Sequence, residues 1–190
     1  MLMKTVVGKM TKRFDHPERR FNAASWDEPL VFGARRPGYP LPRVPDILVE
    51  SWIAFMKTQN ITRVLCLLSA HQLHIYDNLL EQYATQFGEQ QVLWVPIRDF
   101  HLATEEQLLG YILPFLMHAP QRQEKTVVHC SGGVGRTGHV LAAWLVSARH
   151  MTNSQAIASV KYQGRNAREA HDKRLDLLLE RCRQEYVSRS

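Results

Sequence analysis

Cysteine is scarce in this sequence, and the three that are present follow no disulfide spacing. They are Cys66, Cys130 and Cys182, an odd number in a chain of 190 residues. Such a set argues against a disulfide-stapled secreted fold. The nine histidines are scattered, without the short spacings of a metal site. We therefore expect free thiols, no metal or other cofactor, and a reducing compartment, the cytoplasm.

Long apolar runs are also missing. No stretch approaches the roughly 20 apolar residues that a membrane-spanning helix needs. Residues 1–10 carry no apolar core of the kind found in secretory leaders. The sequence therefore predicts no membrane span and no secretory signal.

The chain does have enough apolar residues for one domain and an excess of positive charge. Hydrophobic residues make up 45%, and 24 Lys and Arg against 18 Asp and Glu give a formal net charge of +6. This composition suits a single globular domain with one core. We place that domain at 26–190, after a basic arm at 1–25. The arm is either loose or packed on the domain. The charge favours acidic partners such as phosphorylated protein, nucleic acid or anionic lipid, and nothing in the pattern fixes an oligomeric state.

Short apolar runs alternate with amphipathic segments. Runs rich in Val, Ile and Leu indicate strands at 30–33, the first of them at a sheet edge, and at 61–68, 91–97 and 127–129. Helices are expected at 46–58, at 74–87, from 104 onward, after the glycine-rich loop over 139–146, at 154–162 and at 168–187. This alternation predicts an α/β fold, a single domain with a mainly parallel central sheet flanked by helices on both faces.

The most informative stretch reads His129-Cys130-Ser131-Gly132-Gly133-Val134-Gly135-Arg136-Thr137-Gly138. It stands where a buried strand gives way to an apolar, helix-compatible segment. The glycines leave the main-chain N–H groups of 131–136 free to form an anion-binding nest. Arg136 adds a planar fork that matches two phosphate oxygens. The same positive field favours the thiolate of Cys130, so a nucleophile lies against a bound phosphate.

Two other interpretations of this loop fit less well. A Walker A loop is excluded, because no Gly-Lys-Ser/Thr follows the glycines. A buried cysteine before a glycine-rich turn is the simplest alternative, and it leaves the neighbouring arginine and hydroxyl unexplained.

Attack by cysteine on phosphorus expels an alkoxide or phenoxide, which needs a proton. Asp99 is the candidate acid, because it follows the strand predicted at 91–97 and lies in a non-helical loop. If that strand is parallel to the one before Cys130, both residues lie at the carboxyl edge of the sheet, where ligand sites gather. Alternatively, Asp99 only caps its turn, and Glu105, Glu106 and Asp77 are weaker candidates for the acid.

His-Cys-x5-Arg-Thr-Gly resembles the phosphate-binding loop of the cysteine-dependent protein tyrosine phosphatase superfamily. The chain is much shorter than the tyrosine-specific catalytic domains and looks most like the small dual-specificity-type phosphatases, over about 30–173. The resemblance implies a protein tyrosine phosphatase-like fold. It gives catalytic roles to Cys130, Arg136, Asp99 and Thr137, phosphate binding to Ser131, Gly132, Gly133, Val134, Gly135 and Arg136, and supporting roles to His129, Glu169, Gln163 and Asn166.

Several of these roles come from the family alone. There the hydroxyl at Thr137 donates to the cysteine sulfur, and the histidine at His129 supports the loop. A water-positioning residue is expected within 163–169, where this chain has Gly-Arg-Asn in place of the family's Arg-Pro-Gly. Gln163, Asn166 and Glu169 are its candidates. Arg165 and Arg168 are expected either to widen an anion-attracting rim or to lie exposed at a helix start.

The resemblance implies phosphoester hydrolysis through a cysteinyl phosphate, with a phosphorylated protein as substrate. No aromatic recognition loop of the tyrosine-specific kind is visible, which favours phosphotyrosine together with phosphoserine and phosphothreonine. RNA 5′-triphosphate ends and phosphoinositides are alternative substrates, with nucleic acid the less favoured partner. A phosphate-binding module without turnover is a further option. Rhodanese and arsenate reductase chemistry also uses a loop cysteine, but it fits Arg136 and Asp99 less well.

Overall fold

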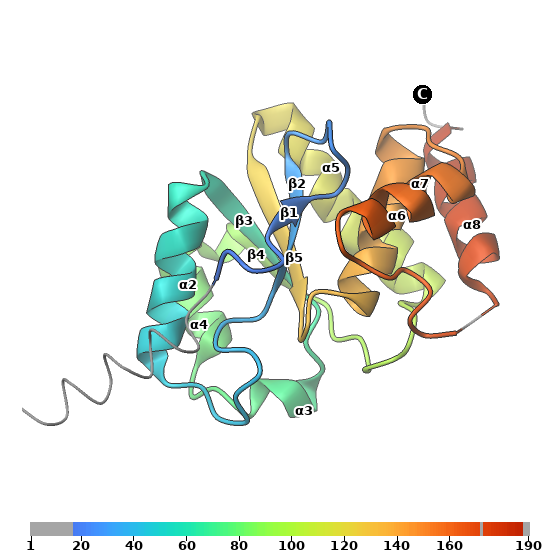
Figure 1. Ribbon diagram of the computed structural model, residues 1–190. Coiled ribbons are helices and arrows are strands. Elements are labelled where there is room, and N and C mark those ends of the chain that lie inside the picture. Colours follow the sequence, from blue (N-terminus) through green and yellow to red (C-terminus); the bar gives the residue numbers. More distant parts are fainter. Residues whose placement is uncertain (1–16, 172, 188–190) are drawn as a thin grey trace, which may run out of the picture.

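The computed structural model describes residues 17–171 and 173–187. Its centre is a five-stranded sheet with helices on both faces (Figure 1). The strands are β1 (Asn22–Ala23), β2 (Val31–Arg35), β3 (Ile61–Cys66), β4 (Val92–Trp94) and β5 (Lys125–Cys130). They lie in the order β1-β2-β5-β3-β4, and every neighbouring pair except β1-β2 is parallel. The predicted α/β fold with a mainly parallel sheet is confirmed.

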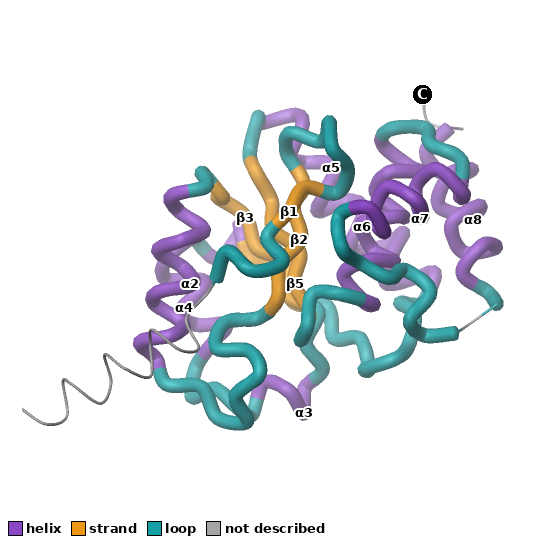
Figure 2. The backbone as a smooth tube through the Cα atoms, in the orientation of Figure 1, coloured by secondary structure: helices purple, strands orange, loops and turns teal. Residues whose placement is uncertain are grey.

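Two helical layers enclose this sheet (Figure 2). One contains α2 (Asp46–Thr58) and α4 (Leu79–Phe87), with the short α3 (Ala70–Leu73) near the carboxyl edge and a 3-10 turn, η1 (Glu89–Gln91), before β4. The other contains the π-helical turn η2 (Gln107–Ile112), α5 (Leu113–Arg122), α6 (Gly135–Ala148), α7 (Asn153–Tyr162) and α8 (Leu175–Val187). No helix within the described residues is both long and apolar enough to cross a bilayer.

Both faces of the central strands are buried, which explains their continuous apolar sequence. Along β5, Val127 packs with the α2 and α4 layer, whereas Val128 packs with the α6 layer. In β3, Val64 and Leu65 alternate in the same way. Because side chains of a strand point alternately to opposite faces, each apolar residue finds one of the two cores.

α6 is the most enclosed helix. Every residue from Gly135 to Ser147 is buried, and the helix contacts α5, α7, α8, β2 and β5. A helix that is apolar around its whole circumference belongs in the interior. The first turn of α6, which carries Gly135, Arg136 and Thr137, is therefore fixed by packing on all sides.

Several predicted elements differ from the structure, and the strand predicted at 91–97 is limited to Val92–Trp94 of β4. The strand predicted at 30–33 is β2, which is not at the edge, because β1 pairs with it antiparallel. The helix predicted at 74–87 is divided into α3 and α4, with a turn at 74–78. The helix predicted to begin at 168 begins at Leu175. There the Asn166 Oδ1 accepts the Arg168 N–H at 3.1 Å, and such local turns compete with helix formation.

The basic arm proposed at 1–25 falls partly outside the described residues, which begin at 17. The part that is described belongs to the folded body. Asn22 and Ala23 form β1, and Ala24 and Ser25 are buried.

Candidate active site

The loop between β5 and α6 is shaped by one glycine and by the end of β2. Gly133 has a φ of 71°. A Cβ at this position would lie 2.6 Å from the Ala34 carbonyl oxygen, so only glycine fits. The Arg36 N–H donates to the Ser131 carbonyl at 3.0 Å. These contacts hold the loop against the neighbouring strand at the centre of the sheet's carboxyl edge.

Cys130 is the last residue of β5 and is 2% exposed. The Thr137 hydroxyl donates to its Sγ at 3.2 Å. The sulfur therefore lies beside the N-terminal turn of α6, where the helix dipole and the free N–H groups favour an anion. Burial raises the pKa of the other two thiols, Cys66 and Cys182, to about 12, which keeps them protonated.

Arg136 extends from the first turn of α6 toward the ends of neighbouring strands and is 3% exposed. Its Nη1 donates to the Ile97 carbonyl at 3.0 Å and to the Gln72 Oε1 at 2.7 Å. Its Nη2 lies 3.0 Å from the Asp99 Oδ1. Main-chain carbonyls thus orient the guanidinium, and its outer nitrogen is paired with a carboxylate.

Asp99 lies in the loop that follows β4, at the same sheet edge as Cys130. Its side chain is 45% exposed and forms the ion pair with Arg136. Its Oδ2 accepts a hydrogen bond from the Gln72 Nε2 at 3.4 Å, and its Oδ1 accepts the Phe100 N–H at 3.2 Å. The structure therefore brings the candidate nucleophile, arginine and acid together around one edge.

Gln72 bridges Arg136 and Asp99, and sequence reasoning missed it. The residue lies in the one-turn helix α3, just after β3, and a capping box with Ser69 fixes that turn. The only signal in the sequence is a polar side chain that follows the carboxyl end of a buried strand. Gln72 both accepts from the guanidinium and donates to the carboxylate, so it sets their relative positions.

His129 supports the main chain of the loop and does not face the sulfur as a charged partner. It is fully buried between Trp52 and Tyr83. Its Nδ1 lies 3.3 Å from the Cys130 carbonyl, which can only accept, so Nδ1 carries the proton and donates. Its Nε2 then accepts from the Tyr83 hydroxyl at 3.2 Å. Burial lowers the pKa of His129 to about 4, so the ring is neutral near pH 7.

His139 is a second buried histidine, which the sequence analysis did not single out. It is 1% exposed in α6, and its Nε2 accepts the Ala103 N–H at 3.0 Å. Burial lowers its pKa to about 4. The contact joins α6 to the far end of the loop that carries Asp99.

These two histidines predict a loss of stability in acid. Both have folded-state pKa values of about 4 against an ordinary 6.5. Below pH 6.5 the unfolded chain binds protons that the folded chain does not, so the free energy of unfolding falls as the pH drops toward 4. Each histidine contributes about 2 kcal/mol to this loss by pH 5, at about 1.4 kcal/mol per pH unit. Urea unfolding near pH 7.5 and near pH 5 measures it.

A matched pair of variants separates this effect from the titration of surface groups. His139→Gln keeps an acceptor for the Ala103 N–H and removes the titrating ring, so its stability should depend less on pH between 6.5 and 4. His71→Gln changes an exposed histidine and should leave the dependence intact. Equal pH dependence in both variants would contradict the assignment.

The segment 163–169 contains three candidates for the water-positioning residue, and two of them contact the loop. A Cβ on Gly135 would collide with the Glu169 side chain, so that side chain packs directly on the start of α6. The Asn166 N–H donates to the Val134 carbonyl at 3.4 Å. Gln163 is the C-cap residue that follows α7, and its carbonyl accepts from the side chains of Arg165 and Asn22. Glu169 is therefore the candidate whose side chain lies against the loop.

Neither expectation for Arg165 is correct. The residue is 2% exposed, and it packs against Gly33, where a Cβ would lie 2.5 Å from its guanidinium. Its Nη2 donates to the carbonyls of Gly33 at 2.6 Å and Asn22 at 3.1 Å. Burial lowers its pKa to about 10. Arg165 thus fastens the 163–169 segment to β1 and β2, while the half-exposed Arg168 pairs with Asp176 at 2.8 Å.

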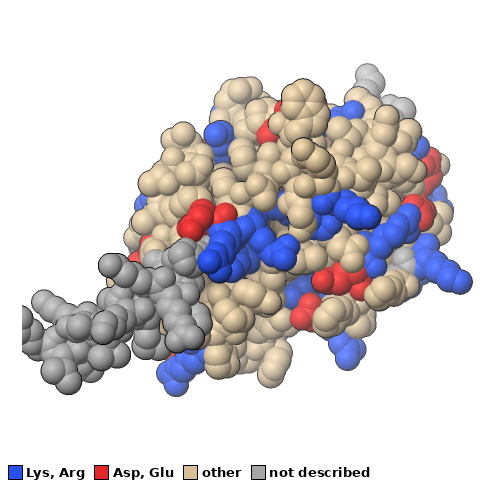
Figure 3. Space-filling view, in the orientation of Figure 1, with Lys and Arg blue, Asp and Glu red and all other residues tan. Residues whose placement is uncertain are grey.

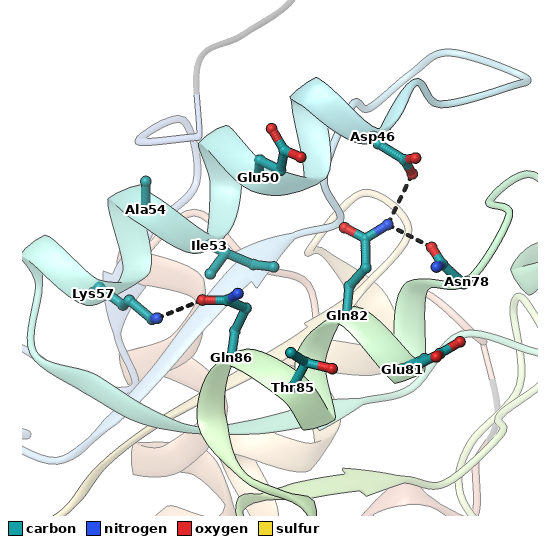
Figure 4. Close-up of a pocket in the computed structure, with 10 residues that line it drawn as sticks. All are labelled: Asp46, Glu50, Ile53, Ala54, Lys57, Asn78, Glu81, Gln82, Thr85 and Gln86. Atoms are coloured by element: carbon teal, nitrogen blue, oxygen red, sulfur yellow. Dashed lines mark hydrogen bonds between the residues drawn. The ribbon is translucent and has the colours of Figure 1, made fainter.

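A groove of about 580 Å³ lies elsewhere, between α2 and α4 (Figure 4). Asp46, Glu50 and Glu81 line it together with one lysine, Lys57. This balance of charge repels a phosphate, and none of its lining residues belongs to the loop around Cys130. Across 17–171 and 173–187, no three His, Cys, Asp or Glu side chains gather in a way that could hold a metal ion.

Residues 50–177 match the family described as the dual specificity phosphatase catalytic domain. Two uncharacterized proteins from Methanocaldococcus jannaschii are each 42% identical to this chain over 52 residues, which is 27% of this chain. The match covers 32% of the first and 35% of the second, about a third of each curated relative.

Several solved structures resemble the whole domain. Tk-PTP in its active form has a TM-score of 0.63 at 24% identity, covering 82% of this chain and 92% of its own. Kinase associated phosphatase, with its catalytic-site cysteine replaced by serine, has a TM-score of 0.66 at 22% identity, covering 83% and 88%. PTPMT1 in complex with PI(5)P has a TM-score of 0.68 at 12% identity, covering 89% and 97%. At these identities the likeness shows a shared fold.

Proposed function

This chain belongs to the dual specificity phosphatase family, and from that premise we propose that it dephosphorylates proteins at phosphotyrosine and at phosphoserine or phosphothreonine. The family carries out cysteine-based phosphoester hydrolysis. The protein substrate and the roles of individual residues are the parts that we propose.

One observation carries the proposal. The Cys130 Sγ accepts a hydrogen bond from Thr137 at 3.2 Å, beside the N-terminal turn of a fully buried helix. Arg136 and Asp99 meet at the same edge of the sheet, 3.0 Å apart. A sulfur nucleophile, a site for a phosphate dianion and a carboxyl group are the three parts that this chemistry needs.

In the first step Cys130 attacks phosphorus and the bond to the leaving oxygen breaks. The main-chain N–H groups of 131–136 and the Arg136 guanidinium stabilise the three equatorial phosphoryl oxygens. Asp99, in its acid form, gives its proton to the leaving oxygen. A bound dianion competes with Asp99 for the Nη2 of Arg136, which frees the carboxyl group to turn toward the leaving group.

In the second step water attacks the cysteinyl phosphate, and the sulfur leaves as a thiolate. Asp99, now ionised, takes the proton of the water. The Thr137 hydroxyl stabilises the departing sulfur through the hydrogen bond already described. Glu169 is our candidate for orienting the water, because its side chain packs on the start of α6. A thiolate nucleophile is lost on oxidation, so we place the enzyme in a reducing compartment such as the cytoplasm.

The test is a substrate panel at equal ionic strength. We expect the purified chain to hydrolyse p-nitrophenyl phosphate and to release phosphate from phosphotyrosine and phosphoserine peptides. Triphosphate-ended RNA and phosphatidylinositol phosphate vesicles are run beside them, with Cys130→Ser as the blank for contaminating activity. Turnover of RNA or lipid with none of the peptides would reject the protein substrate, and turnover of none of them would reject the activity.

A further inference from the structure

The groove between α2 and α4, called here the α2–α4 groove, is built from one stripe of each helix. On α2 the lining positions recur at helical spacing between 46 and 57, and on α4 they do so between 78 and 86. Figure 4 shows the two stripes facing each other, with the buried Ile53 on the floor between them. A volume of about 580 Å³ gives the groove the size of a ligand site.

Hydrogen bonds at both ends of the α2–α4 groove fix the separation of the two helices. At one end the Gln82 Nε2 of α4 donates to the Asp46 Oδ1 of α2 at 2.8 Å and to the Asn78 Oδ1 at 2.6 Å. At the other end the Lys57 Nζ donates to the Gln86 Oε1 at 2.7 Å. The groove is therefore formed before a partner binds, which lowers the entropic cost of binding.

The α2–α4 groove is negatively charged in a chain whose formal net charge is +6. Asp46, Glu50 and Glu81 line it, against Lys57 as the one cation of the lining. Within the part of the chain that the structure describes, no lysine or arginine forms an ion pair with any of these three acids. On the face drawn in Figure 3, Lys and Arg side chains instead gather in a band across the middle. The groove thus offers carboxylates to a cation from outside the chain.

Helix dipoles explain only part of this negative charge. Asp46 and Glu81 lie in the first turns of α2 and α4, where a carboxylate stabilises the end of a helix. Glu50 lies beyond the first turn of α2, where the dipole no longer favours it, and its side chain is exposed. Because like charges on facing helices repel each other, this arrangement favours a positive group between them.

The acidic end of the α2–α4 groove lies toward the loop between β5 and α6. The strands β2, β3 and β4 are parallel to β5, so α2 and α4 both run back from the carboxyl edge of the sheet. Asp46 and Asn78, at the starts of these helices, therefore lie near that edge (Figure 1). Residues 36–45 connect the loop to α2, and the first N–H of this connection, at Arg36, donates to the Ser131 carbonyl at 3.0 Å. One short connection thus separates the groove from the loop.

We propose that the α2–α4 groove binds a basic segment of the phosphoprotein substrate, a run of lysine or arginine residues at some distance from the phosphorylated residue. The inference rests on the proposed function and adds a docking site to it. The cations bind Glu50 and Glu81, and their aliphatic stems cover Ile53. A helix is about 10 Å wide and an extended segment of about eight residues spans roughly 25 Å, so one chain reaches both the loop and the groove.

The first measurement is the affinity of the full chain for a fluorescent peptide that carries a run of arginines and no phosphate, followed by anisotropy. We expect Glu50→Gln/Glu81→Gln to weaken binding by about fivefold, the effect of two exposed charge pairs. Raised salt should weaken the binding of the wild-type chain. The matched control is Glu89→Gln, because Glu89 is exposed in η1 and does not line the groove. This variant should keep the wild-type affinity.

The second measurement places a basic or a neutral run about eight residues from a phosphotyrosine and compares kcat/KM for the two peptides. We expect the ratio, basic over neutral, to exceed one in the wild-type chain through a lower KM at equal kcat, because docking binds substrate and transition state alike. The ratio should approach one in Glu50→Gln/Glu81→Gln, fall below one in Glu50→Lys/Glu81→Lys, and stay unchanged in Glu89→Gln. p-Nitrophenyl phosphate cannot reach the groove, so every variant should hydrolyse it at the wild-type rate.

The outcomes separate the docking site from the function on which it rests. If neither phosphopeptide nor p-nitrophenyl phosphate is hydrolysed, the proposed function fails. If the phosphopeptides are hydrolysed with equal efficiency, or if Glu50→Gln/Glu81→Gln keeps the wild-type preference, only the docking site fails. If Lys9→Gln/Lys12→Gln in the full chain tightens binding of the arginine peptide, a basic segment of this same chain competes for the groove, and the substrate is overturned as its occupant.

Discussion

Cys130→Ser is expected to abolish turnover, lowering kcat on p-nitrophenyl phosphate by roughly 10⁴-fold or more. A serine hydroxyl stays neutral near pH 7, so the position next to phosphorus loses its anionic nucleophile. The exchange removes little volume, and the N–H groups of 131–136 and Arg136 are unchanged. Binding of orthophosphate, measured by calorimetry, should therefore persist in the variant.

A control at another buried thiol shows whether the effect belongs to the site. Cys182 is fully buried in α8, away from the loop, and Cys182→Ser should keep its activity per folded molecule. A Cys130→Ser protein that turns over at the wild-type rate would refute the mechanism. One that loses orthophosphate binding together with activity would mean that the substitution had disturbed the nest.

Asp99→Asn is expected to lower kcat by about 10²- to 10⁴-fold on substrates with strongly basic leaving groups. Phosphoserine, which leaves as an alkoxide, should suffer most, and p-nitrophenyl phosphate least, because p-nitrophenolate needs little protonation. The amide keeps the shape of the side chain and can still accept from the Gln72 Nε2, so a general loss of structure is not expected. A series of aryl phosphates with graded leaving-group basicity measures the effect.

The matched control for this acid is Asp77→Asn. Asp77 is the other aspartate that the sequence left as a candidate, and its side chain is 72% exposed and paired with Arg43. This variant should behave like the wild type across the series. If the loss of rate in Asp77→Asn depended on the basicity of the leaving group, or if that in Asp99→Asn did not, Asp99 would not be the general acid.

The loop could be predicted from the sequence because its chemistry is local. Within the eight residues 130–137 the chain has a thiol, three glycines, an arginine and the Thr137 hydroxyl, at the point where a strand ends and a helix begins. The family predicted from this stretch is confirmed. The sequence also predicted that Asp99 lies near the loop, because parallel strands end at the same edge of a sheet.

Residues that act through distant contacts could not be predicted in this way. Gln72 precedes Arg136 by 64 positions and meets it only when α3 folds over the end of β3. His139 reaches Ala103 across 36 positions. The sequence predicts an exposed Arg165, because a guanidinium usually lies at the surface. It is buried only where carbonyl groups enclose it, and the sequence does not show where that happens. The Gly33 and Asn22 carbonyls that do so are contributed by β1 and β2.

By itself, the sequence predicted the family, the fold class and a candidate nucleophile in a candidate anion nest, since bond geometry and apolar periodicity act between near neighbours. Only the tertiary structure decided which distant side chains converge on that nest. It placed Glu169 against Gly135, joined Asp99 to Arg136 through Gln72 and buried Arg165. Those outcomes depend on strand register and helix packing, which set distances between residues that no local pattern connects.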